Sequence, residues 1–301
     1  MNRLTASLMV LLGATSYGLL SPFVKLAYDA GFSPQEVTSS QFLFALLILA
    51  VLSGVQWDNF KRLRRTDIWL LGVLGLCATG TSIFYYVALN YLPATLAIVL
   101  LFQSAWIVFI IDYFVTRRKP SGMRWAAILM IVCGTFLAVN LFEKEWKEVS
   151  SFGLMLGVLS SISWSAFLYL NEKVTSQAPA IINSFVQVVV STVVIMLVFP
   201  PRFLWNGSIG QGLWVWAAII GLLGQVIPPV LFNKGIPLIG GALAGVLAVM
   251  ELPVAIVSAS LVLGEFVNAW QWSGILLIVL GIVVAQLRTT KIEERKESNK
   301  S

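Results

Sequence analysis

The sequence predicts an all-α integral membrane protein with ten transmembrane helices, arranged as two inverted repeats of five helices each. Of its 301 residues, 58% are hydrophobic and only 11% are charged, whereas a water-soluble domain carries about 25% charged residues. The hydrophobic residues form continuous runs and do not alternate with polar residues as in a membrane β-barrel. The net charge of +6 comes largely from short basic clusters between these runs, which are typical topology signals. This composition excludes a disordered chain, a coiled coil and a nucleic-acid-binding protein.

Ten segments are apolar and long enough to span a bilayer, which takes about 20 residues. The first contains Lys25, lacks a convincing small-residue cleavage site and leads directly into further spans. We therefore expect a membrane helix there and not a cleavable signal peptide. The predicted spans are 4–28, 35–55, 67–90, 93–116, 122–142, 152–172, 179–199, 212–235, 238–263 and 271–288.

A shift of 147 residues aligns the two halves of the sequence. The segment WAAILMIVCGTFLA (125–138) then stands opposite WSGILLIVLGIVVA (272–285), and Tyr17 stands opposite Trp164. Matches at both ends of a half indicate an internal repeat. The predicted units are a first five-helix repeat over 1–145, a second over 151–290, and a charged cytoplasmic tail over 291–301.

The charged residues predict that the two repeats have opposite orientations in the membrane. In the first half, the loops after the second and fourth spans hold basic clusters at 61–65 and 117–124, whereas the matching loops of the second half hold only Arg202 and Glu265. Basic residues stay on the cytoplasmic side, so both termini are expected inside the cell and the loop 143–148 outside. Inverted repeats are typical of secondary transporters, whose sites lie near the bilayer midplane.

Several kinds of chemistry are excluded or unsupported by the sequence. It contains no His, which excludes imidazole catalysis and His-ligated metal sites. Cys77 and Cys133 both lie within apolar runs and are interpreted as packing residues. The loops are too short for a soluble catalytic domain, and no phosphate-binding GxxxxGK[ST] motif occurs. We expect a protein that is not an enzyme and has no cofactor or metal, with the lipid bilayer and a small-molecule substrate as partners and protons as a candidate coupling ion.

Three segments resemble the EamA-like branch of the drug/metabolite transporter superfamily: the opening TSYGLLSPFVK, the EKEWKE connector between the halves, and the ending MELPVAIVSASLVLGEFVNAWQWSGILLIVLGIVVA. The resemblance covers almost the whole chain and is most specific in the last segment. The first repeat departs from it, because Trp106 stands opposite Pro253 and the Arg-Arg pair at 117–118 stands opposite Gly264-Glu265. The resemblance implies ten helices, two repeats and export of small metabolites or drugs, without specifying one substrate.

Glu251 is the most informative candidate residue. It lies near the middle of the ninth span, where a carboxylate costs at least about 2.5 kcal/mol on insertion scales. We interpret it as a proton carrier or as the counter-ion of a substrate amine, and the alternative is a helix–helix hydrogen bond to Gln225 or Gln103. Small residues on the same helical stripe leave room beside it for water or a ligand: Ala244, Ala248, Ala255 and Ser258.

Other polar and aromatic residues are candidates for the same site, each with a structural alternative. Gln225 and Gln103 are either packing residues or ligand contacts, and Lys25 either reaches the membrane interface or contacts a substrate carboxylate. Aromatic rings supply stacking walls or belong to the interfacial belt. Proline residues bend membrane helices beside a cavity and are candidate gating positions. The predicted site residues are Glu251, Gln225, Gln103, Lys25, Tyr17, Trp164 and Tyr86, and the predicted kink positions are Pro22, Pro228, Pro229 and Pro253.

The function that the sequence favours is secondary active transport, with export of small amphipathic metabolites, amino-acid-like compounds or drugs by alternating access. The alternative is an exchanger of anionic metabolites such as nucleotide-sugars or phosphometabolites, which requires basic residues facing the cavity. A membrane-embedded enzyme is disfavoured because no acid–base pair or metal site is evident. A channel is disfavoured because no span is polar enough to form rings of like groups. We expect a multi-pass protein of the cell membrane, and the sequence does not fix its oligomeric state.

Overall fold

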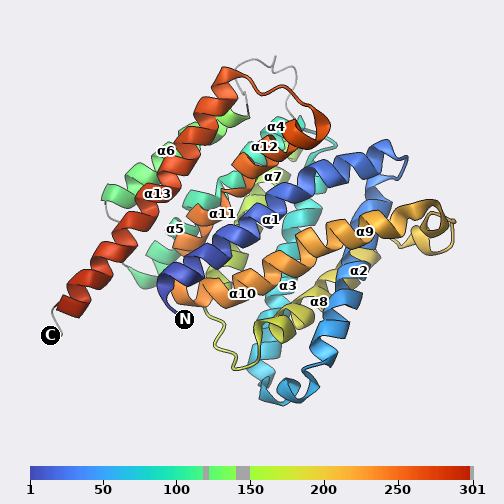
Figure 1. The fold of residues 1–301 in the computed structure, drawn as a ribbon, viewed down its shortest axis with the longest axis horizontal. Coiled ribbons are helices and arrows are strands. Elements are labelled where there is room, and N and C mark those ends of the chain that lie inside the picture. Colours follow the sequence, from blue (N-terminus) through green and yellow to red (C-terminus); the bar gives the residue numbers. More distant parts are fainter. Residues whose placement is uncertain (118–121, 140–149, 299–301) are drawn as a thin grey trace.

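A computed structural model of the protein describes residues 1–117, 122–139 and 150–298. Every regular element within these ranges is a helix (Figure 1). This result confirms the predicted all-α membrane fold, because in a bilayer each backbone N–H and C=O must be satisfied within the protein. The predicted external loop 143–148 lies outside the described residues.

The first half of the chain contains well-capped helix starts. The Asn2 side chain accepts a hydrogen bond from the Thr5 N–H at 2.8 Å, and Ser33 and Glu36 form a capping box. Such caps satisfy backbone N–H groups that have no partner within the helix. The elements are α1 (Arg3–Asp29), α2 (Pro34–Gly54), the 3₁₀ helix η1 (Trp57–Arg62), α3 (Arg65–Ala88), α4 (Ala94–Phe102), α5 (Ser104–Thr116) and α6 (Gly122–Ala138).

The second half is less regular, because one π-helical turn begins its third span and another interrupts that span. The elements are α7 (Ser151–Asn171), α8 (Ala180–Val198), the 3₁₀ turn η3 (Arg202–Leu204), the π-helical turn η4 (Ile209–Leu213), α9 (Trp214–Gly221), the π-helical turn η5 (Leu222–Val226), α10 (Ile227–Ile239), α11 (Gly241–Ala248), α12 (Glu251–Leu263) and α13 (Ala269–Ser298).

The helices agree with the predicted spans in number but not in continuity. Nine membrane-length apolar helices are present in the described ranges when their breaks are bridged, and the shorter Trp125–Ala138 accounts for the remaining span. The predicted span 93–116 is broken at Gln103, and the span 238–263 is broken at Val249 and Met250. At the end of the chain, α13 continues to Ser298 and so extends into the predicted tail.

The same 147-residue shift that aligns the sequence also aligns these elements. The helix α4 begins at Ala94 and α11 begins at Gly241, and the breaks that follow them also correspond. Each of the next helices ends at a left-handed residue, Arg117 with φ 57° and Gly264 with φ 70°. The helix breaks therefore belong to the repeat and are not accidents of one half.

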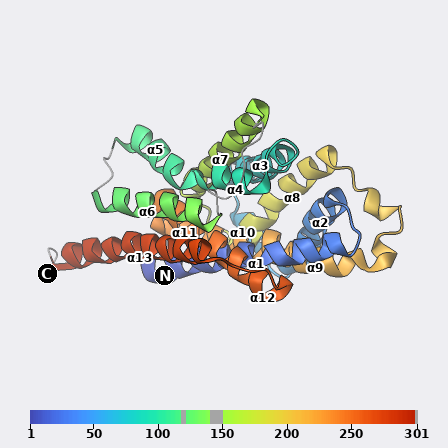
Figure 2. The same ribbon diagram turned by 90° about the horizontal axis from the view of Figure 1, so that it is seen from above.

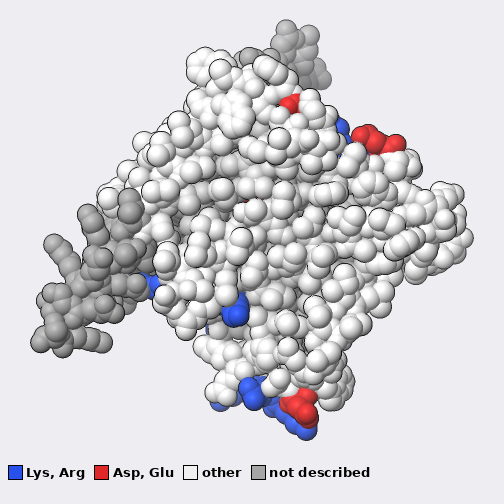
Figure 3. Space-filling view, viewed as in Figure 1, with Lys and Arg blue, Asp and Glu red and all other residues white. Residues whose placement is uncertain are grey.

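The helices form two layers (Figure 2). One layer contains α1, α9, α12 and α13, and the other contains α3, α4, α5 and α7. Within the first layer α1 packs against α12 and also contacts α10, and within the second layer α3 packs against α7 and also contacts α8. On the face drawn in Figure 3, the charged side chains lie toward opposite ends and a broad uncharged band separates them, as expected for a surface in contact with lipid.

The last helix of each repeat packs against the other along a pair of equivalent glycine positions. At Gly134 a Cβ atom would lie 2.8 Å from Ile278 Cγ1, and at Gly281 it would lie 2.9 Å from Ile131 Cγ1. These contacts are images of one another under the 147-residue shift. The helices α6 and α13 thus pair with local two-fold symmetry, side by side in both ribbon views.

This close packing predicts the effect of adding a single methyl group at Gly274. In Gly274→Ala the new Cβ would lie 2.6 Å from Gly134 O and 2.7 Å from Ala138 Cα, so α13 must move away from α6. Overpacking of this kind costs about 1–3 kcal/mol. We expect a lower melting temperature in detergent, measured against Gly122→Ala on α6, whose Cβ meets nothing within 4 Å. Equal melting temperatures for the two variants would show that the helices are not packed this closely.

Candidate functional site

A cavity of about 350 Å³ lies between the two halves of the molecule. Its α1 residues begin at Tyr17 and its α3 residues begin at Ala78, so the cavity lies toward the ends of these two helices. The lining residues come from both repeats: Tyr17, Leu20, Ser21, Val24, Tyr28, Gln41, Ala78, Thr81, Ser82, Tyr85, Tyr86, Leu89, Ile98, Leu101, Phe102, Trp164, Gln225, Glu251, Leu252 and Ala255.

Glu251 is the first residue of α12, directly after the break that separates this helix from α11. The close approach of α1 fixes its position, because a Cβ at Gly18 would lie only 2.6 Å from the Glu251 carbonyl oxygen. Ser258 reinforces this contact by donating a hydrogen bond to Gly18 O at 3.3 Å. Glu251 therefore lies in the first turn of α12, held against α1.

The equivalent contact in the other repeat lacks the acid. Ser165, the counterpart of Gly18, donates a hydrogen bond to the carbonyl oxygen of Ser104 at 3.3 Å. Ser104 is the counterpart of Glu251 under the 147-residue shift. The fold is therefore repeated here, whereas the carboxylate occurs in the second repeat alone.

An aromatic cluster forms the floor of the cavity. Tyr17 and Trp164 meet edge to face with ring centroids 6.1 Å apart, and Trp164 stacks on Phe167 at 4.8 Å. Phe232 closes the cluster at 6.0 Å from Tyr17. Since Tyr17 and Trp164 are equivalent in the two repeats, this contact lies on the internal symmetry axis of the fold. Aromatic pairs of this geometry contribute about 0.5–1.5 kcal/mol beyond the area that they bury.

A second aromatic wall comes from the end of α3. Tyr85 and Tyr86 lie with ring centroids 5.9 Å apart and at 62° to one another. The charge of Glu251 acts on the hydroxyl groups of Tyr17, Tyr85 and Tyr86. Phenol groups from two helices, α1 and α3, therefore share the cavity with Glu251.

Gln41 on α2 has a side-chain oxygen without a hydrogen-bond donor among the described residues, and its side chain lies beside Tyr86. Its side chain and that of Thr38 lie within hydrogen-bonding reach of the Tyr86 hydroxyl. Gln41 is 4% exposed, and its Oε1 atom has no hydrogen-bond partner in the described part of the chain. A buried acceptor without a partner is costly, and Gln41 is one of the residues that line the cavity.

Gln225 reaches the cavity from the π-helical turn η5. Pro228 and Pro229 begin the next helix and have no N–H to donate to the carbonyl groups of that turn. The Ser16 hydroxyl donates to the nearby Leu223 carbonyl oxygen at 2.7 Å, and its repeat counterpart Ser163 donates to Cys77 O, also at 2.7 Å. Irregular helix turns of this kind occur frequently at functional sites.

Five of the seven predicted site residues line the cavity, and two do not. Glu251, Gln225, Tyr17, Trp164 and Tyr86 come together in it. The other two lie elsewhere, and each has a partner there: Gln103 donates to Val99 O at 2.8 Å and accepts from Trp106 Nε1 at 2.7 Å, and Lys25 forms an ion pair with Glu265.

The predicted kink positions fall at helix starts with one exception. Pro22 is buried inside α1. Pro228, Pro229 and Pro253 all lie in the first turn after a break or a π-helical turn, where the missing N–H of a proline costs least. The prolines therefore mark where helices resume, and their gating role stays a prediction.

Most of the lining residues were not predicted as site residues, and four of the polar ones are considered in turn. Tyr28, near the end of α1, is indistinguishable in sequence from an interfacial aromatic, and Tyr85 is adjacent to a predicted residue. Thr81 donates a hydrogen bond to Cys77 O of its own helix at 2.9 Å, as threonines commonly do in membrane helices. Gln41 is a single polar group in a predicted span, which is the one signal that could have found it.

Toward the N-terminal half of α1, the cavity is closed by tightly packed side chains. Ala6 and Val10 of α1 pack with Phe232 and Ile236 of α10, and all four are fully buried. A buried amide network lies beside them. Asn233 accepts from Asn171 at 3.3 Å and donates to Ser184 Oγ at 2.9 Å and to Gln187 Oε1 at 3.0 Å.

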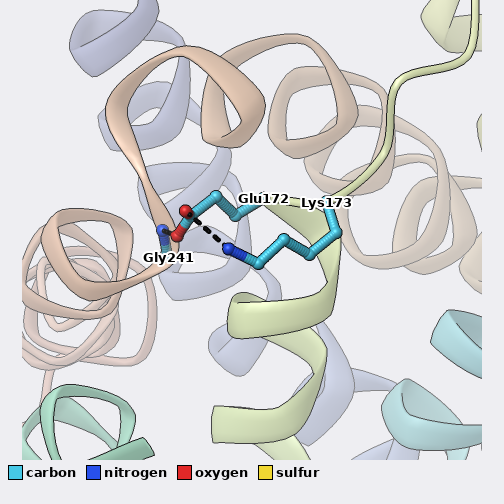
Figure 4. A network of polar contacts seen from close by, with 3 residues as sticks. All are labelled: Glu172, Lys173 and Gly241. Carbon is cyan, nitrogen blue, oxygen red and sulfur yellow. Dashed lines mark hydrogen bonds and ion pairs between the residues drawn. The ribbon is translucent and has the colours of Figure 1, made fainter. Parts of the chain in front are cut away.

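The turn between α10 and α11 is held by the end of α7. Glu172 Oε2 accepts the N–H of Gly241 at 2.9 Å, and Glu172 Oε1 accepts from Lys173 Nζ at 3.1 Å (Figure 4). Glu172 is the repeat counterpart of Lys25. At equivalent helix ends, the two repeats therefore use side chains of opposite charge to hold a neighbouring segment.

Comparison with known proteins agrees with this architecture. The sequence model of the EamA-like transporter family matches residues 4–140 and 151–286. An uncharacterized transporter of Synechocystis is 22% identical over 99% of this chain and 98% of its own. The uncharacterized transporter YcbK of Bacillus subtilis is 24% identical over 95% of both chains, and the uncharacterized inner membrane transporter YicL of Salmonella typhimurium is 24% identical over 85% of this chain and 86% of its own.

A solved crystal structure shares the fold. It superimposes with a TM-score of 0.76 over 97% of this chain and 100% of the other, at 18% sequence identity. At this identity the likeness concerns the arrangement of the helices.

Proposed function

The chain belongs to the EamA-like transporter family, and from this premise we propose that it is a secondary active transporter that exports a small amphipathic molecule by alternating access. Metabolites, amino-acid-like compounds and drugs are the candidate cargo. The observation that carries this proposal is the cavity of about 350 Å³ between the halves, with Glu251 at a helix break in its wall. Broken helices beside a central cavity are typical of secondary transporters.

We place the protein in the cell membrane with both termini in the cytoplasm. The basic clusters at 61–65 and 117–124 support this orientation, as does the division of the chain into inverted repeats over 1–145 and 151–290, followed by the tail 291–301. In this orientation the cavity lies on the outer side of the molecule, and the packing of α1 against α10 closes the cytoplasmic side.

Glu251 is the coupling residue in this proposal. An ionisable group at membrane depth is rare, and such groups mark proton relays and substrate pathways in transporters. Within the described residues no hydrogen bond or ion pair engages its carboxylate. The carboxylate is thus available to a proton in one state and to substrate in another.

The exchange of anionic metabolites is the second candidate function and has less support. It requires a basic side chain in the cavity to hold a phosphate or carboxylate group. No Lys or Arg is found among the residues that line the described cavity. Lys25, the predicted contact for an anion, is paired with Glu265 outside it.

The orientation predicts that α1 is reachable from outside along its second half alone. In a background with Cys77 and Cys133 replaced, Ser21→Cys should react with a membrane-impermeant maleimide added to intact cells, because Ser21 is exposed and lines the cavity. Ser7→Cys, on the same helix but 1% exposed, is the matched control. Labelling of Ser21→Cys only after permeabilisation would contradict the proposed orientation.

The coupling role predicts that Glu251→Gln abolishes transport driven by a pH gradient while the protein still folds. The substitution keeps the size of the side chain and removes its titration, so a residue used for packing alone should tolerate it. Flux into liposomes is measured with and without a pH gradient, with Glu265→Gln as the control because it makes the same change outside the cavity. Wild-type flux for Glu251→Gln at every pH would contradict the proposal.

A further inference from the structure

We infer that the cavity binds a protonated primary or secondary amine that carries one aromatic ring, with Glu251 as its counter-ion and the Gln41 carbonyl oxygen as a second acceptor. This inference rests on the proposed function, because it names the substrate class of the same cavity. Three independent features of the cavity wall support it: its charge, its unsatisfied acceptor and its aromatic surface.

The charge of the cavity favours a cation. Glu251 is the one acidic or basic side chain among the residues that line the described cavity, and the other titratable groups there are the hydroxyls of Tyr17, Tyr28, Tyr85 and Tyr86. A carboxylate without a partner in a low-dielectric site is strongly destabilising, and an incoming cation supplies the missing partner.

The unsatisfied acceptor favours a cation that has N–H groups. Gln41 Oε1 is buried without a partner, and an ammonium N–H is a donor that it lacks. Tyr86 lies between the two acceptors of the proposed site, Gln41 and Glu251. Its hydroxyl is within hydrogen-bonding reach of the Gln41 side chain and interacts electrostatically with Glu251. A quaternary ammonium ion has no N–H and leaves the Gln41 oxygen unsatisfied.

The aromatic surface supplies both a stacking wall and cation–π contacts. Trp164 and Tyr17 form the floor, and Tyr85 and Tyr86 form a second wall. A cation within about 6 Å of such ring centroids gains about 0.5–2 kcal/mol. The volume of about 350 Å³ lies at the small end of the range for ligand sites, about 300–1,000 Å³, so one ring with a short amine chain fits.

The same features disfavour zwitterions and anions. A free amino acid brings a carboxylate that finds no Lys or Arg among the residues lining the described cavity. Its carboxylate and Glu251 would then lie in one small site, and like charges at close range repel. The class inferred is therefore an aromatic amine and not an aromatic amino acid.

Four related compounds test the inference. Phenethylamine is the cation, phenethyl alcohol is neutral, phenylalanine is the zwitterion and 3-phenylpropionate is the anion, all on a similar skeleton. Binding to the purified full-length protein is measured by calorimetry at a pH where the amine is protonated. We expect phenethylamine to bind and the other three to bind at least about tenfold more weakly, the loss expected when one charge-assisted contact is removed.

Variants connect this preference to the named residues. Glu251→Gln should weaken phenethylamine binding about tenfold or more, while Glu251→Asp retains part of it because the charge persists. Gln41→Met removes the acceptor with little change in size and should weaken phenethylamine several-fold, and more than phenethyl alcohol, whose neutral O–H donates a weaker hydrogen bond than an ammonium N–H. Glu265→Gln is the matched control and should bind as the wild type does. Melting temperatures show that each variant is folded.

The outcomes separate this inference from the proposed function. Absence of phenethylamine binding, equal binding of phenethyl alcohol, or tighter binding of phenylalanine or 3-phenylpropionate would each overturn the amine assignment. Amine binding that depends on Glu251 but is accompanied by no flux in liposomes would support the site and contradict the transport function. Flux of another compound class that depends on Glu251 would support transport and contradict the amine assignment.

Discussion

In a bilayer the protein itself must satisfy its backbone polar groups, and this constraint decides where the helices can be broken. The breaks at Gln103 and after Ala248, together with the turn η5, all face neighbouring helices or the cavity. Where a helix bond is lost, a side chain often replaces it, as Ser16 does for the Leu223 carbonyl oxygen. Irregular backbone is tolerated at membrane depth only within protein or beside water, so the breaks and the cavity occur together.

The internal repeat accounts for the geometry of the cavity, and departures from the repeat account for its chemistry. Tyr17 and Trp164 meet on the symmetry axis, and the two repeats pair through α6 and α13 in the same symmetric way. Glu251, by contrast, stands opposite Ser104. In the proposed mechanism the symmetric scaffold alternates between two similar states, and the carboxylate proposed to select the cargo occurs in one repeat alone.

The sequence predicts the helices well and the breaks poorly. Long apolar runs and clustered charges are sufficient for the ten spans, because the bilayer permits few alternatives. The break at Gln103 contains neither Pro nor Gly, so local propensity gives no signal for it. In the structure, the Gln103 side chain spans the break: it donates a hydrogen bond to Val99 O and accepts one from Trp106 Nε1.

The sequence predicts those site residues whose type is rare in a membrane span, and it misses those whose type is common there. A carboxylate in mid-span identifies Glu251 without any structure. Lys25 and Gln103 are polar residues in apolar spans, as expected of site residues. They lie outside the cavity, where Lys25 pairs with Glu265 and Gln103 bonds to Trp106. Tyr28 and Gln41 face the cavity because of the rotation of α1 and α2 about their axes, which the hydrophobic pattern of a membrane helix does not fix.

The central claim is that one carboxylate, Glu251, binds a proton and an organic cation in turn. Proton release on adding phenethylamine to purified protein in weakly buffered solution tests it most directly, at several pH values around neutrality. The account predicts release that approaches one proton per bound amine at the lower pH values and is absent from Glu251→Gln. Binding of the amine without proton release at any pH, or equal release from Glu251→Gln, would contradict it.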